Sequence, residues 1–170
     1  MSKSVNRSFY PVRFLDTAGR GGERYNGRFA SRCAEQIHVR TLRDCMFEVT
    51  VDDTFAAGHY LRNYKGKCEK PHGHNYKIRV TLVGAELDKA GLLLDFKDLR
   101  EVMRHVIDRL DHQMINDIEP FTLINPSAEN LAKYFYDESN TRLKSVTNGR
   151  VCVKDVTVFE TDTTTAKYSE

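Results

Sequence analysis

Residues 75–84 carry the sequence feature that most restricts how this chain can fold. Four apolar side chains alternate there with polar ones: Tyr76, Ile78, Val80 and Leu82. A period of two places the apolar set on one face of a β-strand and the polar set on the other. One buried face and one solvated face are typical of antiparallel sheets. Residues 46–51 alternate in the same way, so the sequence predicts at least two half-buried strands.

Two amphipathic helices are predicted to follow these strands. Asp95 is a favourable N-cap, and apolar residues come after it at the i, i+3, i+4 and i+7 positions of a helix face. Ser127 is the predicted N-cap of the second helix. Residues 151–159 and 163–168 are predicted as two further strands. The order β-β-α-α-β-β indicates an α+β domain in which two helices cover one face of a sheet.

The first 45 residues differ in composition from the rest. Residues 1–44 hold nine Lys and Arg against four Asp and Glu, a net charge of +5, which leaves −3 for the remainder. This Arg- and Gly-rich stretch lacks apolar clusters, so residues 1–45 are predicted as a basic, flexible N-terminal arm and residues 46–170 as the folded domain. A solvated tail, a translation start at Met46 and an arm that meets an anionic partner are open alternatives.

Composition argues against several partners and locations. The net charge of +2 gives no reason to expect nucleic acid or an anionic membrane. No apolar run of about 18 residues is present to span a bilayer, and the N-terminus lacks the apolar segment of a signal peptide. Four cysteines are too few and too irregularly spaced for a disulfide scaffold. We therefore expect a cytoplasmic protein with no nucleic-acid or membrane partner.

His72 and His74 stand at the start of the strand predicted over residues 75–84. Their spacing of two projects both imidazoles to the same side of the chain. His59 follows a stretch of small residues after the first strand, and adjacent antiparallel strands could bring the three imidazoles together. Three neutral imidazoles hold Zn²⁺ and leave a fourth position for water or substrate. His59, His72 and His74 are therefore candidate ligands of a catalytic Zn²⁺, although a lone histidine such as His59 is more often a core or surface residue.

The role of Cys68 depends on that metal. As a fourth ligand Cys68 would close the site and make it structural, whereas beside a metal and an imidazole it would be a thiolate base or nucleophile. Asp111 and His112 form a carboxylate–imidazole pair near the end of the first helix, which suits an oriented acid–base partner. The simpler interpretation of that pair is a helix C-terminal cap. The residues alone leave these alternatives open.

The ordered motifs resemble those of the 6-pyruvoyl-tetrahydropterin synthase family. The resemblance covers residues 46–168 and rests on these motifs: Phe55-Ala56-Ala57-Gly58-His59, Cys68-x-x-x-His72-Gly73-His74-Asn75-Tyr76, Leu110-Asp111-His112, Pro126-Ser127-Ala128-Glu129-Asn130-Leu131-Ala132 and Glu160-Thr161. It implies the tunnelling fold, in which a four-stranded antiparallel sheet carries two helices. It also implies a homohexamer of two stacked trimers, with active sites at subunit interfaces.

The resemblance further implies a role for each site residue. The family's zinc ligands match His59, His72 and His74. Its catalytic thiol matches Cys68, and the relay partners of that thiol match Asp111 and His112. The acid that anchors the pterin ring matches Glu160, since a carboxylate can accept two parallel hydrogen bonds from the ring's amino and N–H edge.

The implied substrate is 7,8-dihydroneopterin triphosphate. Three residues between Cys68 and His72 resemble the bacterial 6-carboxy-5,6,7,8-tetrahydropterin synthases of queuosine (7-deazaguanine) biosynthesis, whereas the pyruvoyl-forming branch has a longer spacing. We therefore expect a lyase that releases 6-carboxy-5,6,7,8-tetrahydropterin, acetaldehyde and triphosphate.

Glu69 departs from that pattern. Family members with a glutamate at this place form 6-hydroxymethyl-dihydropterin for folate synthesis, although a solvated loop carboxylate explains Glu69 equally well. The alternatives are therefore a hydroxymethyl-forming enzyme that uses Glu69, a 6-pyruvoyl-tetrahydropterin synthase, and a non-catalytic zinc- or pterin-binding protein.

Overall fold

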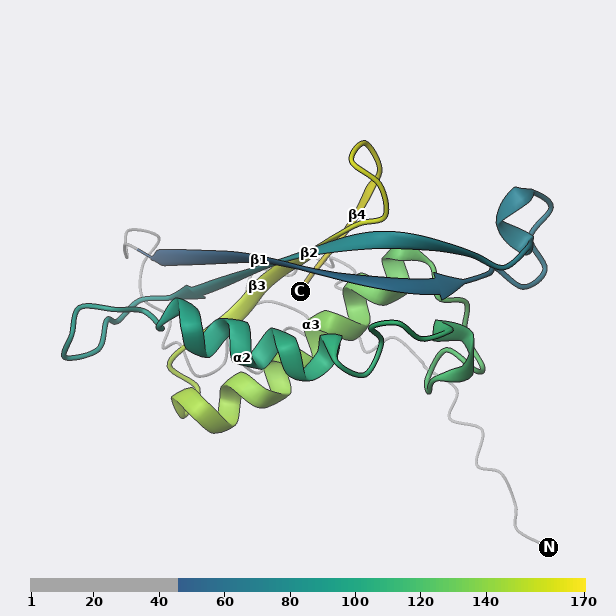
Figure 1. The fold of residues 1–170 in the computed structure, drawn as a ribbon. Coiled ribbons are helices and arrows are strands. Elements are labelled where there is room, and N and C mark those ends of the chain that lie inside the picture. The colour runs from purple at the N-terminus through teal and green to yellow at the C-terminus, as the bar shows by residue number, and fades with distance from the viewer. Residues whose placement is uncertain (1–45) are drawn as a thin grey trace, which may run out of the picture. The chain divides into compact units, whose positions relative to one another are not determined.

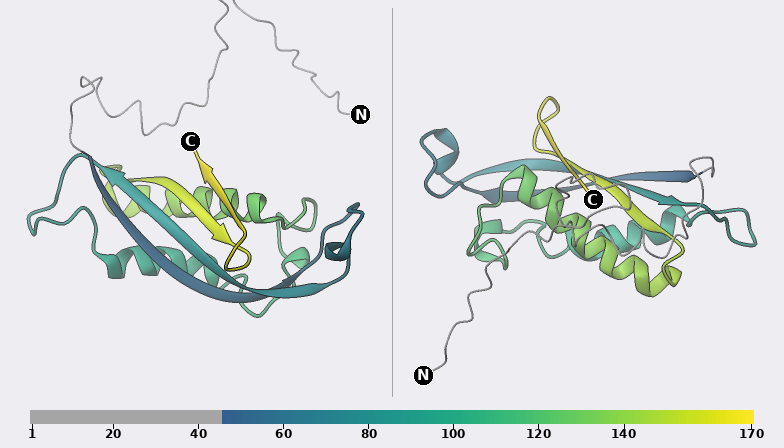
Figure 2. Two further views of the ribbon diagram at one scale, coloured as in Figure 1. Left: turned by 90° about the horizontal axis from the view of Figure 1, so that it is seen from above. Right: turned by 180° about the vertical axis from the view of Figure 1, so that it is seen from behind.

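The computed structural model describes residues 46–170, so the arm predicted over residues 1–45 lies outside the described residues. Four strands form one antiparallel sheet in the order of the chain: β1 Phe47–His59, β2 His72–Gly84, β3 Cys152–Phe159 and β4 Thr165–Ser169. Two helices, α2 Phe96–Ile107 and α3 Ala128–Thr147, lie between β2 and β3 in the chain. Both cover the same face of the sheet (Figures 1 and 2). The expected α+β fold with the order β-β-α-α-β-β is confirmed.

The alternation in β2 has the predicted effect on burial. Its four alternating apolar side chains are fully buried at 0% exposure: Tyr76, Ile78, Val80 and Leu82. Burying a side chain of this size stabilises a fold by about 1.5–3 kcal/mol. On the opposite face, Arg79 donates two hydrogen bonds of 2.8 Å to the Asp52 carboxylate of β1. The sheet therefore has an apolar face under the helices and a polar face away from them.

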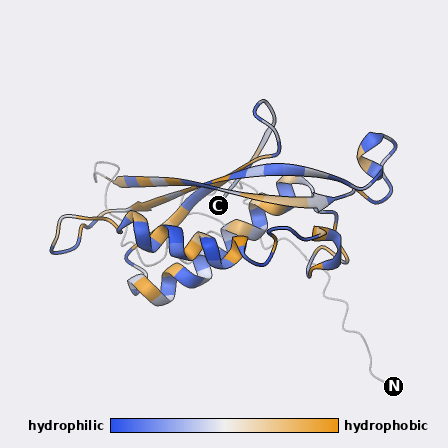
Figure 3. Cartoon of the chain, viewed as in Figure 1, coloured by the Kyte–Doolittle hydropathy of each residue, from blue (hydrophilic) through white to orange (hydrophobic). Residues whose placement is uncertain are grey.

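Both helices begin where their caps predict. The Asp95 carboxylate accepts a hydrogen bond of 2.8 Å from the Lys97 N–H at the start of α2, and the Ser127 hydroxyl accepts one of 3.4 Å from the Asn130 N–H at the start of α3. Hydrophobic and hydrophilic residues alternate along both helices (Figure 3), and buried apolar residues of each helix belong to the same core cluster as those of the sheet. The α-helical geometry of α2 ends at Ile107, before the predicted end near Leu110, although Leu110 remains fully buried in the turn that follows.

β1 and β2 are longer than their apolar patterns. The two strands pair without interruption from Phe47↔Gly84 to His59↔His72, so the ladder runs through the small and polar residues at one end. The loop between them contains the short helix η1 Lys67–Glu69, and a second short helix, η2 Ile115–Asp117, lies between α2 and α3. This end of the β1–β2 pair holds the histidines.

Two further observations concern the helices and the cysteines. None of the helices in the described part of the chain has the length and apolar character needed to cross a membrane. Cys68 carries a free thiol, whereas Cys152 at the start of β3 is disulfide-bonded. Because disulfides are uncommon in cytosolic proteins, the cytoplasmic location stays a prediction.

Candidate metal centre

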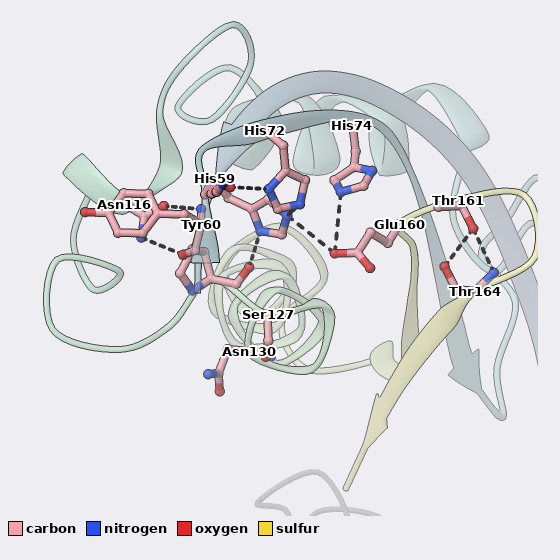
Figure 4. Close-up of polar contacts among 12 residues, drawn as sticks. His59, Tyr60, His72, His74, Asn116, Ser127, Asn130, Glu160, Thr161 and Thr164 are labelled. Carbon is pink, nitrogen blue, oxygen red and sulfur yellow. Dashed lines mark hydrogen bonds and ion pairs between the residues drawn. The ribbon is translucent and has the colours of Figure 1, made fainter. Parts of the chain in front are cut away.

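Three histidines converge at the paired ends of β1 and β2. His59 is the Cα partner of His72, and His74 is the partner of Ala57 two residues earlier on β1. Side chains two apart on a strand share a face, so all three imidazoles point to the helix-covered side. One ring nitrogen from each lies within 4.8 Å of the others, and the Nε2 atoms of His59 and His72 are 3.1 Å apart. Figure 4 shows the three rings pointing toward one another.

Backbone carbonyls fix the tautomers of two of these rings. The Nδ1 atom of His59 lies 2.8 Å from the Pro126 carbonyl oxygen, and the Nδ1 atom of His72 lies 2.8 Å from the Lys70 carbonyl oxygen. A carbonyl oxygen only accepts, so both Nδ1 atoms carry the proton and both Nε2 lone pairs face the centre. Burial is the main cause that lowers the pKa of His59, which keeps this ring neutral.

This arrangement fits a metal ion. Two Nε2 lone pairs 3.1 Å apart repel each other unless a cation or a proton lies between them. The Nε2 atom of His74 is buried and has no hydrogen-bond partner, and a buried polar atom without a partner is costly. A cation at the centre would satisfy all three nitrogens, and ring orientation by a carbonyl at the second nitrogen is the usual support for a histidine ligand.

Glu160 lies beside the histidines, directly after β3. Its Oε1 atom is 3.5 Å from His59 Nε2 and 3.9 Å from His74 Nε2, and its side chain is 30% exposed. Figure 4 shows the carboxylate pointing at the imidazoles. The structure therefore places the residue matched to pterin binding next to the candidate metal ligands.

Cys68 lies in η1, within the β1–β2 loop. Its carbonyl oxygen accepts a hydrogen bond of 2.8 Å from the Leu61 N–H, which ties η1 to the chain just after β1. In the described part of the chain, the group of possible metal-ligating atoms contains the three histidines and does not contain Cys68. The arrangement therefore does not support Cys68 as a fourth ligand. Glu69, the next residue, is exposed.

Asp111 and His112 dock against the outer edge of β1. The Asp111 carboxylate accepts a hydrogen bond of 2.9 Å from the Ala56 N–H, and the His112 N–H donates one of 2.6 Å to the Ala56 carbonyl oxygen. The bond from Ala56 is the main cause that lowers the pKa of Asp111. This carboxylate therefore binds a strand, whereas the Asp111 N–H donates to the Ile107 carbonyl oxygen at the end of α2, at 2.9 Å.

The same carboxylate holds the neighbouring imidazole. The Oδ1 atom of Asp111 is 3.0 Å from His112 Nδ1, and the His112 side chain is 80% exposed. His112 has a φ of 57°, a left-handed backbone that is uncommon for a residue other than glycine. Among the described residues, no hydrogen bond or ion pair joins this pair to Cys68 or to the histidines. The structure presents an oriented imidazole to solvent, apart from the candidate metal centre.

The sequence did not reveal the residues that support the site. Asn116 accepts from the Tyr60 N–H and donates to the Tyr60 carbonyl oxygen, both at 2.9 Å, and so binds the chain directly after His59. Arg62 donates to the Phe121 carbonyl oxygen at 2.8 Å. These bonds hold the end of β1 against the segment that leads to Pro126, whose carbonyl orients His59. No motif marks such contacts, because they depend on loop geometry.

Tyr76 is a second residue of the site that the sequence placed only in the core. Its ring lies 5.9 Å from the ring of His59 and 5.5 Å from that of His74, and its hydroxyl is buried without a hydrogen-bond partner. Burial raises the pKa of Tyr76 far above its ordinary range, so the hydroxyl stays protonated. The Tyr76 ring thus packs against the imidazoles of His59 and His74.

The fold and the histidine cluster together define an α+β protein with a candidate metal centre at the end of a β-hairpin. Residues 48–170 match the family described as 6-pyruvoyl tetrahydropterin synthase. The chain belongs to this family, and its membership supports a pterin synthase activity.

Relatives with two different activities are similar to this chain. It is 33% identical over 138 residues to the 6-carboxy-5,6,7,8-tetrahydropterin synthase of Bacillus subtilis, covering 78% of this chain and 92% of the relative. It is 36% identical over 141 residues to the human 6-pyruvoyl tetrahydrobiopterin synthase, covering 74% and 93%. The solved structure of Caenorhabditis elegans 6-pyruvoyl tetrahydropterin synthase aligns with a TM-score of 0.65 at 28% identity, covering 76% of this chain and 99% of that one.

Proposed function

We propose that this protein is a zinc-dependent lyase that converts 7,8-dihydroneopterin triphosphate and one water to 6-carboxy-5,6,7,8-tetrahydropterin, acetaldehyde and triphosphate. The observation that carries the proposal is the convergence of His59, His72 and His74, which bring one ring nitrogen each within 4.8 Å of the others. The Bacillus subtilis relative with the 6-carboxy activity supports the choice of product. So does the spacing of three residues between Cys68 and His72. We place the reaction in queuosine (7-deazaguanine) biosynthesis.

The three histidines would hold Zn²⁺, which as a Lewis acid polarises the hydroxyls of the pterin side chain and acidifies the adjacent C–H. Cys68 would take and return that proton as a thiolate. Asp111 holds the Nδ1 side of His112, so the Nε2 side of that ring is available to exchange a proton with the substrate. Glu160 would accept the two hydrogen bonds from the pterin ring edge.

We also propose a homohexamer of two stacked trimers. His112 is 80% exposed and lies on the outer edge of β1. Among the described residues, no hydrogen bond or ion pair joins this exposed imidazole to Cys68 or to the three histidines of its own chain. Such an arrangement suits an active site that a neighbouring subunit completes. Size-exclusion chromatography with light scattering tests this assembly, and a monomer at working concentration contradicts it.

The alternative products rest on separate observations. The human relative supports a 6-pyruvoyl-tetrahydropterin synthase as the first alternative, because this chain is 36% identical to it and 33% identical to the Bacillus relative. Glu69 is exposed beside Cys68, which leaves a hydroxymethyl-forming reaction open. A non-catalytic zinc-binding protein is the third alternative.

Incubation of the purified, zinc-loaded protein with 7,8-dihydroneopterin triphosphate, followed by mass spectrometry of the pterins, separates these readings. We expect 6-carboxy-5,6,7,8-tetrahydropterin and acetaldehyde. Cys68→Ala should abolish turnover and keep zinc, whereas loss of zinc from Cys68→Ala would make the thiol a structural ligand. A hydroxymethyl product that disappears in Glu69→Ala would move the enzyme to the folate reaction.

A further inference from the structure

The geometry beside the histidines points to a second role for Glu160. We propose that the Glu160 carboxylate is a fourth ligand of the metal in the substrate-free protein and leaves the metal when a pterin ring binds. This inference rests on the proposed function, because it concerns the same metal and the same class of substrate. It makes the opening of the metal site depend on recognition of the ring.

Distances between several of the polar atoms approach those of a metal coordination shell. In a tetrahedral site with bonds of about 2.0–2.2 Å to nitrogen and oxygen, neighbouring ligand atoms lie about 3.3–3.6 Å apart. The Nε2 atoms of His59 and His72 are 3.1 Å apart, and Glu160 Oε1 is 3.5 Å from His59 Nε2 and 3.9 Å from His74 Nε2. The carboxylate oxygen thus lies close to two of the three nitrogens.

The chemistry of these atoms also calls for a cation. The Nδ1–H groups of His59 and His72 donate hydrogen bonds to carbonyl oxygens, so the lone pairs of both Nε2 atoms face the centre. The Glu160 carboxylate adds negative charge at the same place, and the described residues supply no Lys or Arg side chain in an ion pair with it. Nitrogen lone pairs and a carboxylate can together bind one divalent cation.

The Glu160 side chain has to turn before the carboxylate completes the coordination. Within residues 46–170, the group of possible ligand atoms that lie within 4.8 Å of one another contains the three histidines and not Glu160, so Glu160 still has to close toward His72. The terminal torsion of a glutamate is soft, and this side chain is 30% exposed. The Glu160 N–H donates to the Thr164 carbonyl oxygen at 3.1 Å, which anchors the backbone while the side chain turns.

The two roles of Glu160 exclude each other. Two parallel hydrogen bonds to the pterin edge need both carboxylate oxygens, and one of them faces the imidazoles here. A ring that takes the carboxylate would therefore free the fourth metal position for the hydroxyls of the same substrate. A molecule with hydroxyls but no pterin ring would meet a closed site.

Competition for zinc between the protein and a chromophoric chelator tests this exchange. The probe is bare pterin, which has no side chain at C6 and hence no hydroxyls for the metal. Because coupling between two sites is reciprocal, release of Glu160 should weaken zinc binding by about 5- to 150-fold at saturating pterin, the usual range for coupled sites. Glu160→Ala should bind zinc more weakly than the parent, and pterin should then have no effect on it.

Glu138→Gln is the matched control, because Glu138 is similarly exposed and lies on α3 in an ion pair with Arg109. It should keep both the zinc affinity and the response to pterin. Zinc affinity that is unchanged or higher with bound pterin overturns the exchange. If that result accompanies normal product formation, the proposed function stands and only the inference fails, whereas a protein that binds no pterin at all contradicts both.

Discussion

Replacing the histidines one at a time should separate their metal-binding role from their structural role. His72→Ala and His59→Ala each remove one of the three proposed histidine ligands, so both should lose the stabilisation that zinc gives. Free zinc at 100 times its Kd raises the free energy of unfolding of the parent by about 2.7 kcal/mol. We expect most of this increment to vanish in either variant.

Without metal the two variants should differ. His59 is 1% exposed and its Nδ1–H satisfies the buried Pro126 carbonyl, so His59→Ala leaves an unpaired acceptor that costs about 1–3 kcal/mol. The cavity adds to that cost. His72 is partly exposed and its partner, the Lys70 carbonyl, is exposed and open to water. His72→Ala should therefore change metal-free stability by no more than about 0.5 kcal/mol.

Urea unfolding followed by circular dichroism, at one protomer concentration and with buffered zinc, measures both effects. The reasoning is refuted if zinc stabilises His72→Ala as much as the parent. It is equally refuted if the two variants have the same metal-free stability.

Three further predictions concern the residues around the site. Asp111→Asn should lower turnover by about 10²–10⁴-fold, as for loss of a general acid–base group, with zinc content unchanged by metal analysis. The pKa of Asp111 is lowered from its ordinary 3.8, so the ionised carboxylate stabilises the folded state fully above that pH. This stabilisation is lost as the pH falls through the pKa of the folded state, and acid unfolding of Asp111→Asn should lack that loss. The free energy of unfolding should be higher for His112→Gly than for His112→Ala by roughly 1 kcal/mol, because glycine adopts the φ of 57° without strain. Both variants should lose turnover. Asn116→Ala should lower the free energy of unfolding by about 1–3 kcal/mol in the same assay, since its two bonds to Tyr60 are part-buried.

The elements that the sequence predicts well are those with a periodic or capping signal. The alternation around Ile78 specified the buried face of β2, and Asp95 and Ser127 specified the starts of both helices. The extent of β1 and β2 was underestimated, because the pairing from Ala56 to His59 continues through small and polar residues that carry no strand pattern. There the partner strand decides the structure, not local propensity.

The candidate site likewise contains residues that the sequence suggested and residues that it did not. Residue types and spacing suggested His59, His72 and His74 as a group, and antiparallel pairing brings them together. The approach of Glu160 to two of these rings could not be deduced, because it depends on the register of β3 against β2. The carbonyls of Pro126 and Lys70 are equally invisible to sequence reasoning, since every residue has one. The bond of the Asp111 carboxylate to the Ala56 N–H could not be deduced either, because it depends on how the chain turns after α2.

The central claim is that this metal centre carries out pterin chemistry, and the products of one incubation test it most directly. Zinc-loaded protein supplied with 7,8-dihydroneopterin triphosphate should yield 6-carboxy-5,6,7,8-tetrahydropterin by mass spectrometry, and the metal-free protein should yield none. Recovery of unchanged substrate from the zinc-loaded protein, under conditions where His59, His72 and His74 hold one zinc per chain, would contradict the account.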